Sequence, residues 1–214
     1  ASIILDETFV TAGTSHHSME PRTAMAYWEN GKCYLHASTQ SQSFVHPGIA
    51  AYIGIEPENL VYIAEYCGGG FGSKGGPYPL LSIPAHMSRK VQKPVLMRIS
   101  RSEEYFLGSA RPGFQGRIKM GFRDDGRITA IDVYIVQENG PNQGGGDMNA
   151  AASAISIVYT PLNMRYRGMS VLTNPPPRGA QRGPGQNQMA TAVEPLLDKA
   201  AKQLGLDQVA IRHI

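Results

Sequence analysis

The chain has few cysteines and no long apolar run. Its 214 residues include two cysteines, Cys33 and Cys67, which form no disulfide framework and are too few for an iron–sulfur cluster, a site that needs about four thiolates. No stretch approaches the ~18 consecutive apolar residues of a membrane-spanning helix, and no basic, apolar leader resembles a signal peptide. We therefore expect a cytoplasmic protein, and any iron–sulfur cluster that its reaction needs is expected on another chain.

A surplus of one charge is also missing. Twenty lysines and arginines against 17 aspartates and glutamates leave a net charge of +3, and the basic residues are scattered among the acidic ones. Such a pattern gives no electrostatic reason to expect a nucleic acid as partner. With 42% apolar residues, a chain of this length can bury a core and form one large domain or two small ones.

Periodicity and turn residues predict a mixed α and β chain without internal repeats. An Asn-Gly turn at 30–31 and the turn at 124–126 each join two strands of a hairpin. The apolar stripe that begins at Met189 recurs at helical spacing, and Pro195 is expected either to kink this helix or to begin a second one. The expected strands are 2–10, 23–29, 33–38, 60–64, 95–99, 117–122, 127–136 and 164–172, with Ile118, Met120 and Phe122 alternating on one face. The expected helices are 41–53, 79–92, a short turn opened by a capping box at Ser100 and Glu103, 150–158 and 189–204.

The most informative segment is 65–76, in which six of twelve residues are glycine. Glycine exposes its backbone N–H and tolerates positive φ, so the run can form a nest of amides for an anionic or oxygen-rich group. A flexible linker or a tight turn would also use glycine, but would not need Phe71. The spacing does not match a phosphate loop of the GxxxxGK(S/T) type. A strand at 60–64, expected to be buried, leads into the loop and directs its amides at a ligand.

A second loop, at 175–186, is rich in proline, glycine and arginine. Together, the two loops resemble those of a known family. The sequence GGGFGSK at 68–74, and the sequence RGPG at 182–185 that follows Thr173-Asn174, resemble the molybdenum-cofactor-binding large subunit of the xanthine dehydrogenase and aldehyde oxidoreductase family. Segments 38–41, 98–104 and 159–163 fall in the family's order, so that the resemblance covers nearly the whole chain.

The resemblance implies a fold and a set of cofactors. The fold is of the α+β class, with mixed sheets and packed helices, and residues 1–214 form part of the molybdopterin-binding region, as one unit or as two sub-domains that meet near residues 100–150. The cofactor is molybdenum bound to molybdopterin, which in bacterial members is the cytosine dinucleotide form. Iron–sulfur (2Fe-2S) clusters and, in some members, FAD belong to partner chains.

The resemblance also gives the two loops their roles. Gly69, Gly70, Phe71 and Gly72 are expected beside the cofactor, with the amide at the Phe-Gly step close to a molybdenum oxo group. The second loop contributes Arg182 and Gly183, near the metal-bound oxygen and the pterin, unless Arg182 instead pairs with a surface carboxylate. At the pterin tail we expect Gln186 or Gln188. No residue of this chain is predicted to be a metal ligand or a catalytic group.

Several positions depart from the family pattern. Gly75 stands where purine-oxidising members have a substrate-binding glutamate, and Ala150 stands near the position of their arginine, so purine oxidation is not expected. Pro184 replaces an aromatic residue that sandwiches flat substrates, which leaves the substrate open. A glutamine that contacts the oxo group in several members is expected near residues 14–15, where this chain has Thr-Ser. His16, which begins an HxxMEP motif, either faces the metal pocket or packs beneath it, and packing is favoured.

The implied activity is hydroxylation of an activated C–H bond, in an aldehyde or an N-heteroaromatic compound, with oxygen from water and electrons leaving through an iron–sulfur partner. The family's general-base glutamate is expected beyond residue 214, on a further polypeptide or segment. Two alternatives stay open: a structural or assembly subunit of the same fold, and a nucleotide-binding module in which 68–76 holds a diphosphate at a helix N-terminus. The nucleotide module is less favoured, because no acidic residue ends the next strand, 95–99.

Overall fold

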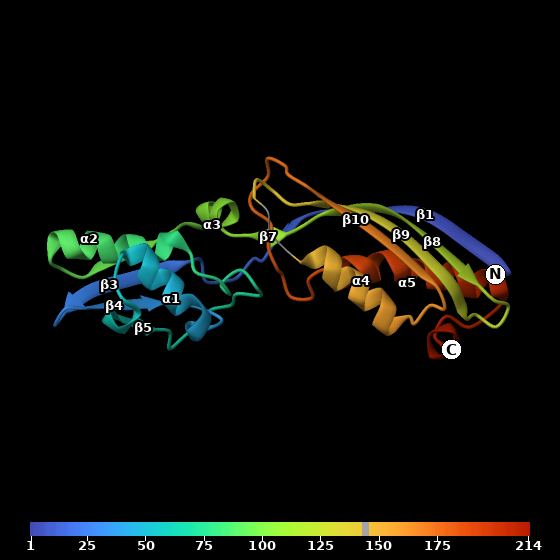
Figure 1. The fold of residues 1–214 in the computed structure, drawn as a ribbon, viewed down its shortest axis with the longest axis horizontal. Helices are drawn as coiled ribbons and strands as arrows, with labels where there is room; N and C mark the ends of the chain where they lie inside the picture. The colour runs from blue at the N-terminus through green and yellow to red at the C-terminus, as the bar shows by residue number, and fades with distance from the viewer. Residues whose placement is uncertain (143–145) are drawn as a thin grey trace. The chain divides into compact units, whose positions relative to one another are not determined.

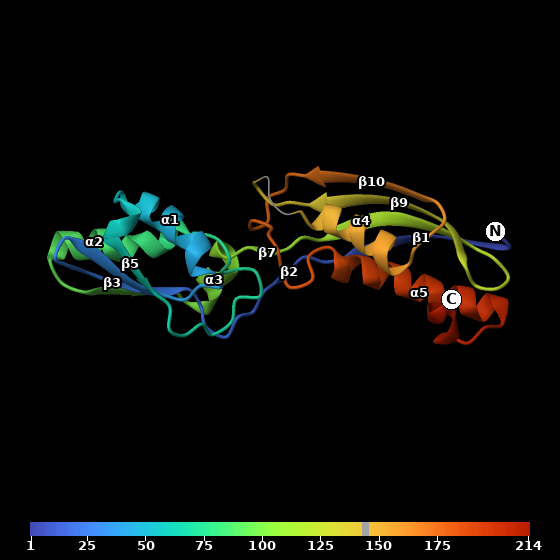
Figure 2. The ribbon, with the colours of Figure 1, turned by 60° about the horizontal axis from the view of Figure 1, so that its bottom comes forward.

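The computed structural model describes residues 1–142 and 146–214. The chain divides into two compact units, which we call the terminal unit (1–14 and 110–214) and the inserted unit (15–109). Each unit contains a four-stranded sheet and helices that pack on it (Figures 1 and 2). The mixed sheets with packed helices confirm the predicted fold class. Two short strands, β2 (Thr14–Ser15) and β7 (Ala110–Arg111), mark where the chain passes between the units.

The sheet of the terminal unit has the strand order β1-β8-β9-β10. Its strands are β1 (Ile3–Thr11), β8 (Phe114–Phe122), β9 (Ile128–Glu138) and β10 (Met164–Val171). The first three are antiparallel neighbours, whereas β10 runs parallel to β9. A parallel neighbour requires a crossover, and α4 (Asp147–Val158) provides it. This helix and α5 (Gln186–Leu204) lie along the same face of the sheet (Figures 1 and 2).

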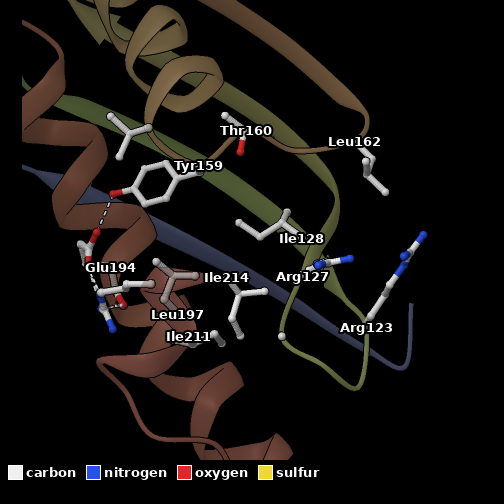
Figure 3. Close-up of a pocket in the computed structure, with 13 residues that line it drawn as sticks. Arg123, Arg127, Ile128, Tyr159, Thr160, Leu162, Glu194, Leu197, Ile211 and Ile214 are labelled. Atoms are coloured by element: carbon white, nitrogen blue, oxygen red, sulfur yellow. Dashed lines mark hydrogen bonds and ion pairs between the residues drawn. The ribbon is translucent and has the colours of Figure 1, made fainter.

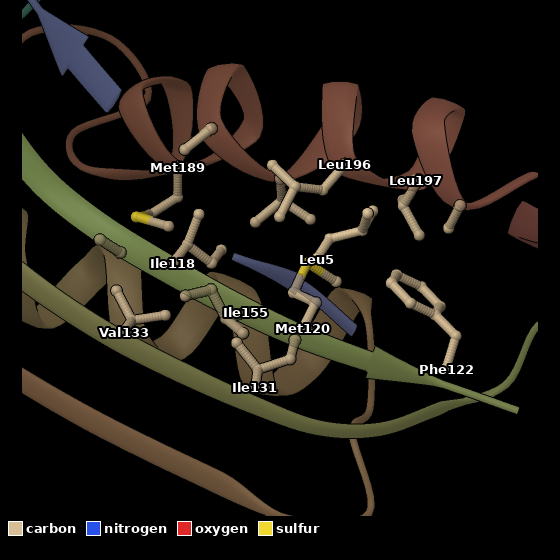
Figure 4. Packing of buried hydrophobic residues seen from close by; sticks show 14 of the residues in the cluster. Leu5, Ile118, Met120, Phe122, Ile131, Val133, Ile155, Met189, Leu196 and Leu197 are labelled. Atoms are coloured by element: carbon tan, nitrogen blue, oxygen red, sulfur yellow. The ribbon is translucent and has the colours of Figure 1, made fainter. Parts of the chain in front are cut away.

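The core of the terminal unit fills the space between the sheet and these two helices (Figure 4). The alternation predicted for β8 is confirmed, because Ile118, Met120 and Phe122 are all fully buried on one face. Helix α5 covers them as one continuous element: Pro195 lies inside it and does not begin a second helix. The other α5 and β9 residues of this core include Ile131, Val133, Met189, Val193, Leu196 and Leu197.

The inserted unit has the strand order β5-β4-β3-β6. These strands are β5 (Leu60–Ile63), β4 (Lys32–Ala37), β3 (Thr23–Glu29) and β6 (Val95–Arg98). Its helices are α1 (Gln42–Ile53), α2 (Ile83–Val91) and α3 (Arg101–Leu107), with short 3-10 turns at Pro57–Asn59 and Pro79–Ser82, and a third such turn, Ala210–His213, ends the terminal unit. Both α1 and α2 contribute buried side chains to a single apolar cluster with β3 and β4. The sheet is therefore covered on one face.

Local signals placed the C-terminal ends of the helices to within one residue, whereas α2, α4 and α5 begin three or four residues away from their expected starts. Ser100 and Glu103 form the predicted capping box, in which each side chain accepts a hydrogen bond from the other residue's backbone N–H. Gly54 ends α1 in the left-handed conformation. The strand expected to be buried at 60–64 is instead an edge strand, since β5 pairs only with β4, and three of its four residues are only half-buried. Within the described ranges, no helix is both long and apolar enough to cross a membrane.

The helix α1 offers a test of the inserted unit's core. Ile49 is fully buried, whereas Phe44 on the same helix is 68% exposed. The substitution Ile49→Ala should lower the free energy of unfolding by about 2–5 kcal/mol, because it removes buried methyl groups and leaves a cavity. Phe44→Ala should change it by less than about 1 kcal/mol. Urea unfolding of the two variants checks this, and equal losses would contradict the packing described.

Candidate functional site

The glycine-rich loop lies in the inserted unit, between the end of β5 and the 3-10 turn at Pro79–Ser82. Turns and bends fill most of it, and no helix begins at its glycines, since the next α-helix starts at Ile83. The nucleotide-binding alternative needs the dipole of a helix N-terminus directly at the loop. This geometry removes the physical basis of that alternative.

The backbone of the loop is held in an uncommon conformation. Phe71 has φ +54°, between Gly69 at +97° and Gly72 at +111°. A bulky residue in the left-handed region costs about 1–3 kcal/mol and persists only where the surroundings fix it, which happens mostly at functional sites. The Phe71 side chain is also 44% exposed, so burial of its ring does not explain the strain.

Three consecutive amides of the loop have no hydrogen-bond partner. The N–H groups on either side are used internally: Gly68 donates to Glu20, Gly72 to Gln40, and Ser73 to the Gly70 carbonyl. Within the described residues, the N–H groups of Gly69, Gly70 and Phe71 donate to nothing. Gly70 is buried and Gly69 half-buried, whereas Phe71 is exposed, and buried backbone donors are nearly always paired. This trio is therefore a place where a ligand can bind.

The side chain of Gln40 organises the centre of the loop. Its Oε1 accepts hydrogen bonds from the N–H of Gly72 at 2.8 Å and of Lys74 at 3.1 Å. Gly70 lies so close that a Cβ there would overlap the Gln40 side chain. The sequence analysis quoted the segment 38–41 but assigned Gln40 no role, because the contact joins residues over thirty positions apart.

This contact also changes which amide is available. The sequence analysis expected the amide at the Phe-Gly step to face a molybdenum oxo group. In the structure the Gly72 N–H is bound to Gln40, so the open amide nearest to this step is that of Phe71. Gly69 and Gly70 supply the other two donors. Gly72 has φ +111° and turns the backbone directly after the three open amides.

The buried side chains of Lys74 and Arg22 anchor the glycine-rich loop to the rest of the inserted unit. Lys74 donates through Nζ to the Glu20 carboxylate at 2.8 Å, and its side chain is 2% exposed. Burial disfavours the charged form of Glu20, but hydrogen bonds from Lys74 and from the Gly68 N–H outweigh it and hold the pKa of Glu20 below its ordinary value. Arg22, buried and paired with Glu104, donates to both the carbonyl and the hydroxyl of Ser73.

His16 packs inside the inserted unit. Only 8% of it is exposed, and its Nδ1 lies 2.8 Å from the carbonyl oxygen of Ser109, which requires Nδ1 to be the donor. This is the packing arrangement favoured for His16. The residue of the HxxMEP motif that contacts the glycine-rich loop is its glutamate, Glu20, which the sequence analysis did not single out.

The second loop lies in the terminal unit and is organised by one buried guanidinium. Arg111 donates through Nε to Gln181 Oε1 at 2.6 Å, through Nη2 to the Arg182 carbonyl at 2.6 Å and through Nη1 to the Gly183 carbonyl at 2.9 Å. Its Nη1 also donates to Gln188 Oε1 at 3.0 Å. Burial lowers the pKa of Arg111, and the negative charge of Asp147 opposes this shift. Nothing in the sequence marked Arg111, because its partners lie seventy or more residues away.

The residues predicted to bind the cofactor from this loop have different environments in the structure. Arg182 is exposed, and within the described residues its side chain forms no ion pair, so the expected surface carboxylate is not found. The loop arginine that does pair with a carboxylate is Arg178, whose Nη2 lies 2.7 Å from Glu138 Oε1. Gln188 is buried, with Oε1 bound to Arg111 and Nε2 to the Pro112 carbonyl, and is therefore wrong as a residue for the pterin tail. Gln186 is exposed at the start of α5.

A cavity of about 420 Å³ lies elsewhere in the terminal unit, beside the second half of α5 (Figure 3). Six of the thirteen residues that line it are aliphatic and three are arginines, and the Tyr159 hydroxyl donates to Glu194 Oε1 at 2.6 Å. None of the residues that line it belongs to either loop. In the described part of the chain, no three histidine, cysteine, aspartate or glutamate side chains gather in a group able to hold a metal.

The order of the second loop should depend on Arg111. Arg111→Lys removes the planar fork, so that some of the four acceptors stay buried and unpaired at a cost of about 1–3 kcal/mol each. We expect faster hydrogen exchange across residues 181–188 and a lower midpoint of urea unfolding. The control is Arg117→Lys, which alters a pair on the exposed face of the sheet, where the arginine side chain is 65% exposed, and should cost less than about 1 kcal/mol. Similar losses in both variants would contradict this role.

Comparisons with known proteins match the whole chain. The model of the molybdopterin cofactor-binding domain family covers residues 1–214. The aldehyde oxidoreductase molybdenum-binding subunit PaoC of Escherichia coli (strain K12) is 30% identical over 213 residues, and the aldehyde oxidoreductase of Megalodesulfovibrio gigas is 29% identical over 216. These alignments span 99% and 100% of this chain but only 29% and 24% of those proteins.

The fold gives the same result. The crystal structure of quinoline 2-oxidoreductase from Pseudomonas putida 86 superposes with a TM-score of 0.87 at 27% sequence identity, covering 99% of this chain and 28% of that one. The resemblance inferred from the two loops is confirmed. The chain belongs to the molybdopterin cofactor-binding domain family, within the xanthine dehydrogenase and aldehyde oxidoreductase group of molybdenum enzymes.

Proposed function

We propose that this chain is the molybdenum-cofactor-binding part of an oxidoreductase that hydroxylates an activated C–H bond with oxygen from water. The observation that carries the proposal is the trio of fixed, unpartnered N–H groups at Gly69, Gly70 and Phe71. Backbone amides suit oxo, thiolate and phosphate groups, because they donate hydrogen bonds without adding a titrating group. When bound, the cofactor supplies two-electron redox chemistry.

The chain's own residues bind and orient the cofactor. In the first loop, Gly69 and Gly70 let the ligand approach the backbone, and Gly72 ends the trio. In the second, Arg111 fixes the carbonyls of Arg182 and Gly183, while the Arg182 guanidinium stays exposed and able to meet an anionic group. Gln186, exposed beside this loop, is the remaining candidate for the pterin tail, for which we propose the cytosine dinucleotide form.

The substrate and the partners follow from the chain's relatives. An aldehyde or an N-heteroaromatic compound is the proposed substrate class, since the relatives are named for aldehydes and for quinoline. The remaining molybdopterin-binding polypeptide would carry the general-base glutamate, an iron–sulfur subunit would accept the electrons, and an FAD subunit would pass them on. We propose the cytoplasm as the compartment of this assembly.

The first experiment is analysis of metal and nucleotide in the native complex, purified through this chain. Plasma mass spectrometry should find molybdenum, and chromatography after acid release should find CMP in an equal amount. Molybdenum with a different nucleotide would leave the activity in place and overturn only the cytosine form. The absence of both from a complex with all its partners would favour the alternative of a structural or assembly subunit.

A second experiment tests the loop itself. Gly72 has φ +111°, a conformation in which a β-branched side chain is strained, so Gly72→Val should displace the neighbouring amides. Turnover per complex should fall by about a hundredfold, the scale of a displacement of roughly 1 Å. Gly76→Ala is the matched control, because a Cβ at Gly76 meets no atom within 4 Å, and its activity should be unchanged. Unchanged turnover in a molybdenum-loaded Gly72→Val complex would count against the proposed function.

A further inference from the structure

Glu20 ties together the two ends of the glycine-rich loop. Its Oε2 accepts a hydrogen bond from the Gly68 N–H at 2.6 Å and from Lys74 Nζ at 2.8 Å. Its backbone repeats both links, because the Glu20 N–H donates to the Gly68 carbonyl at 3.2 Å and its carbonyl accepts from Lys74 Nζ at 2.9 Å. Glu20 therefore forms a bridge between Gly68 and Lys74, and residues 69–73 lie between the two bridged positions.

The bridge is charged and in close contact with the loop. The Lys74 side chain is 2% exposed and the Glu20 side chain 33% exposed. The ammonium group is therefore shielded from solvent, whereas the carboxylate is still partly solvated. A buried ion pair adds little to stability by itself, but it fixes geometry, and removal of one partner leaves an uncompensated charge. Gly68 lies against the Glu20 stem closely enough that a Cβ there would approach the Glu20 Cβ to 2.5 Å.

Residues 69–73, between the bridged positions, make too few interactions with one another to hold their own backbone conformation. Three of them have positive φ, and glycine loses more conformational freedom on folding than any other residue. Within this span the structure gives one backbone hydrogen bond, from the Ser73 N–H to the Gly70 carbonyl. The direction of the open amides at Gly69, Gly70 and Phe71 must therefore be imposed from outside the span.

We propose that Glu20 is a positioning residue of the cofactor site, and that its carboxylate, by joining Gly68 to Lys74, sets the direction of the three open amides. Glu20 acts through the loop and touches neither cofactor nor substrate. The inference rests on the proposed function, because the amides matter only if they meet the cofactor. It differs from the roles of Gln40, which accepts from the N–H groups of Gly72 and Lys74, and of Arg22, which is paired with Glu104 and donates to Ser73, because these contacts hold only the end of the loop next to Lys74.

The experiment compares three variants of the full complex. Glu20→Gln keeps the size of the side chain but leaves the Lys74 ammonium buried without a countercharge, so both the melting temperature and the molybdenum content should fall. The double variant Glu20→Gln/Lys74→Met removes that stranded charge and should recover the melting temperature, since apolar replacement of a buried pair is often neutral. Glu7→Gln is the control, as Glu7 pairs with Lys199 in an exposed position of the terminal unit.

A positioning role and a merely structural one predict different results for the double variant. If Glu20 positions the amides, molybdenum per complex or turnover per molybdenum stays at least about tenfold below wild type, although the fold is restored. The Mo(V) paramagnetic resonance spectrum of any loaded fraction should also differ from wild type. Recovery of content, turnover and spectrum together with the melting temperature would overturn the inference while leaving the proposed function intact. Absence of molybdenum from the wild-type complex would instead remove the proposed function, and the inference with it.

Discussion

A loop that offers its backbone amides to a ligand cannot use those amides to hold its own shape, and this constraint governs both loops of the chain. In a strand or helix the ladder of N–H···O=C bonds fixes the backbone, but here the donors at 69–71 must stay open. Side chains from distant segments supply the missing order. Gln40 and Glu20 fix the first loop, and Arg111 fixes the second.

The two sheets explain why those side chains can be so exact. Gln40 lies shortly after β4, and Arg111 ends β7, which pairs with β2 and is joined to β8 by Pro112 and Gly113, so each is tied to a strand by a short segment of chain. The helices α1 and α5 then cover one face of each sheet and complete a buried core beneath it. Rigid elements thus place the supporting side chains, while the loops keep the irregular backbone that ligand binding requires.

Exposed and buried charged groups also contribute differently to this chain. Surface pairs such as Arg117 with Asp6 lie on the exposed face of the sheet, where water screens them and their contribution is small. The buried charges of Lys74, Arg22 and Arg111 are different. Each donates to specific acceptors at fixed positions, so the side chain is held in one arrangement. Such groups add little net stability but specify one arrangement, which is what a binding loop without secondary structure needs.

The sequence by itself determined the elements and the identity of the two loops. Turn residues, helix caps and alternation are local, so they placed the hairpin at 124–126, the capping box at Ser100 and the C-terminal ends of α1 and α5 correctly. The glycine pattern at 68–74 likewise indicated the family. What only the tertiary structure decided was which side chains hold those loops, namely Gln40, Glu20 from the HxxMEP motif and Arg111, and that Gln188 is used internally. Each of these contacts joins residues more than thirty positions apart, and no local pattern records a hydrogen bond across such a separation.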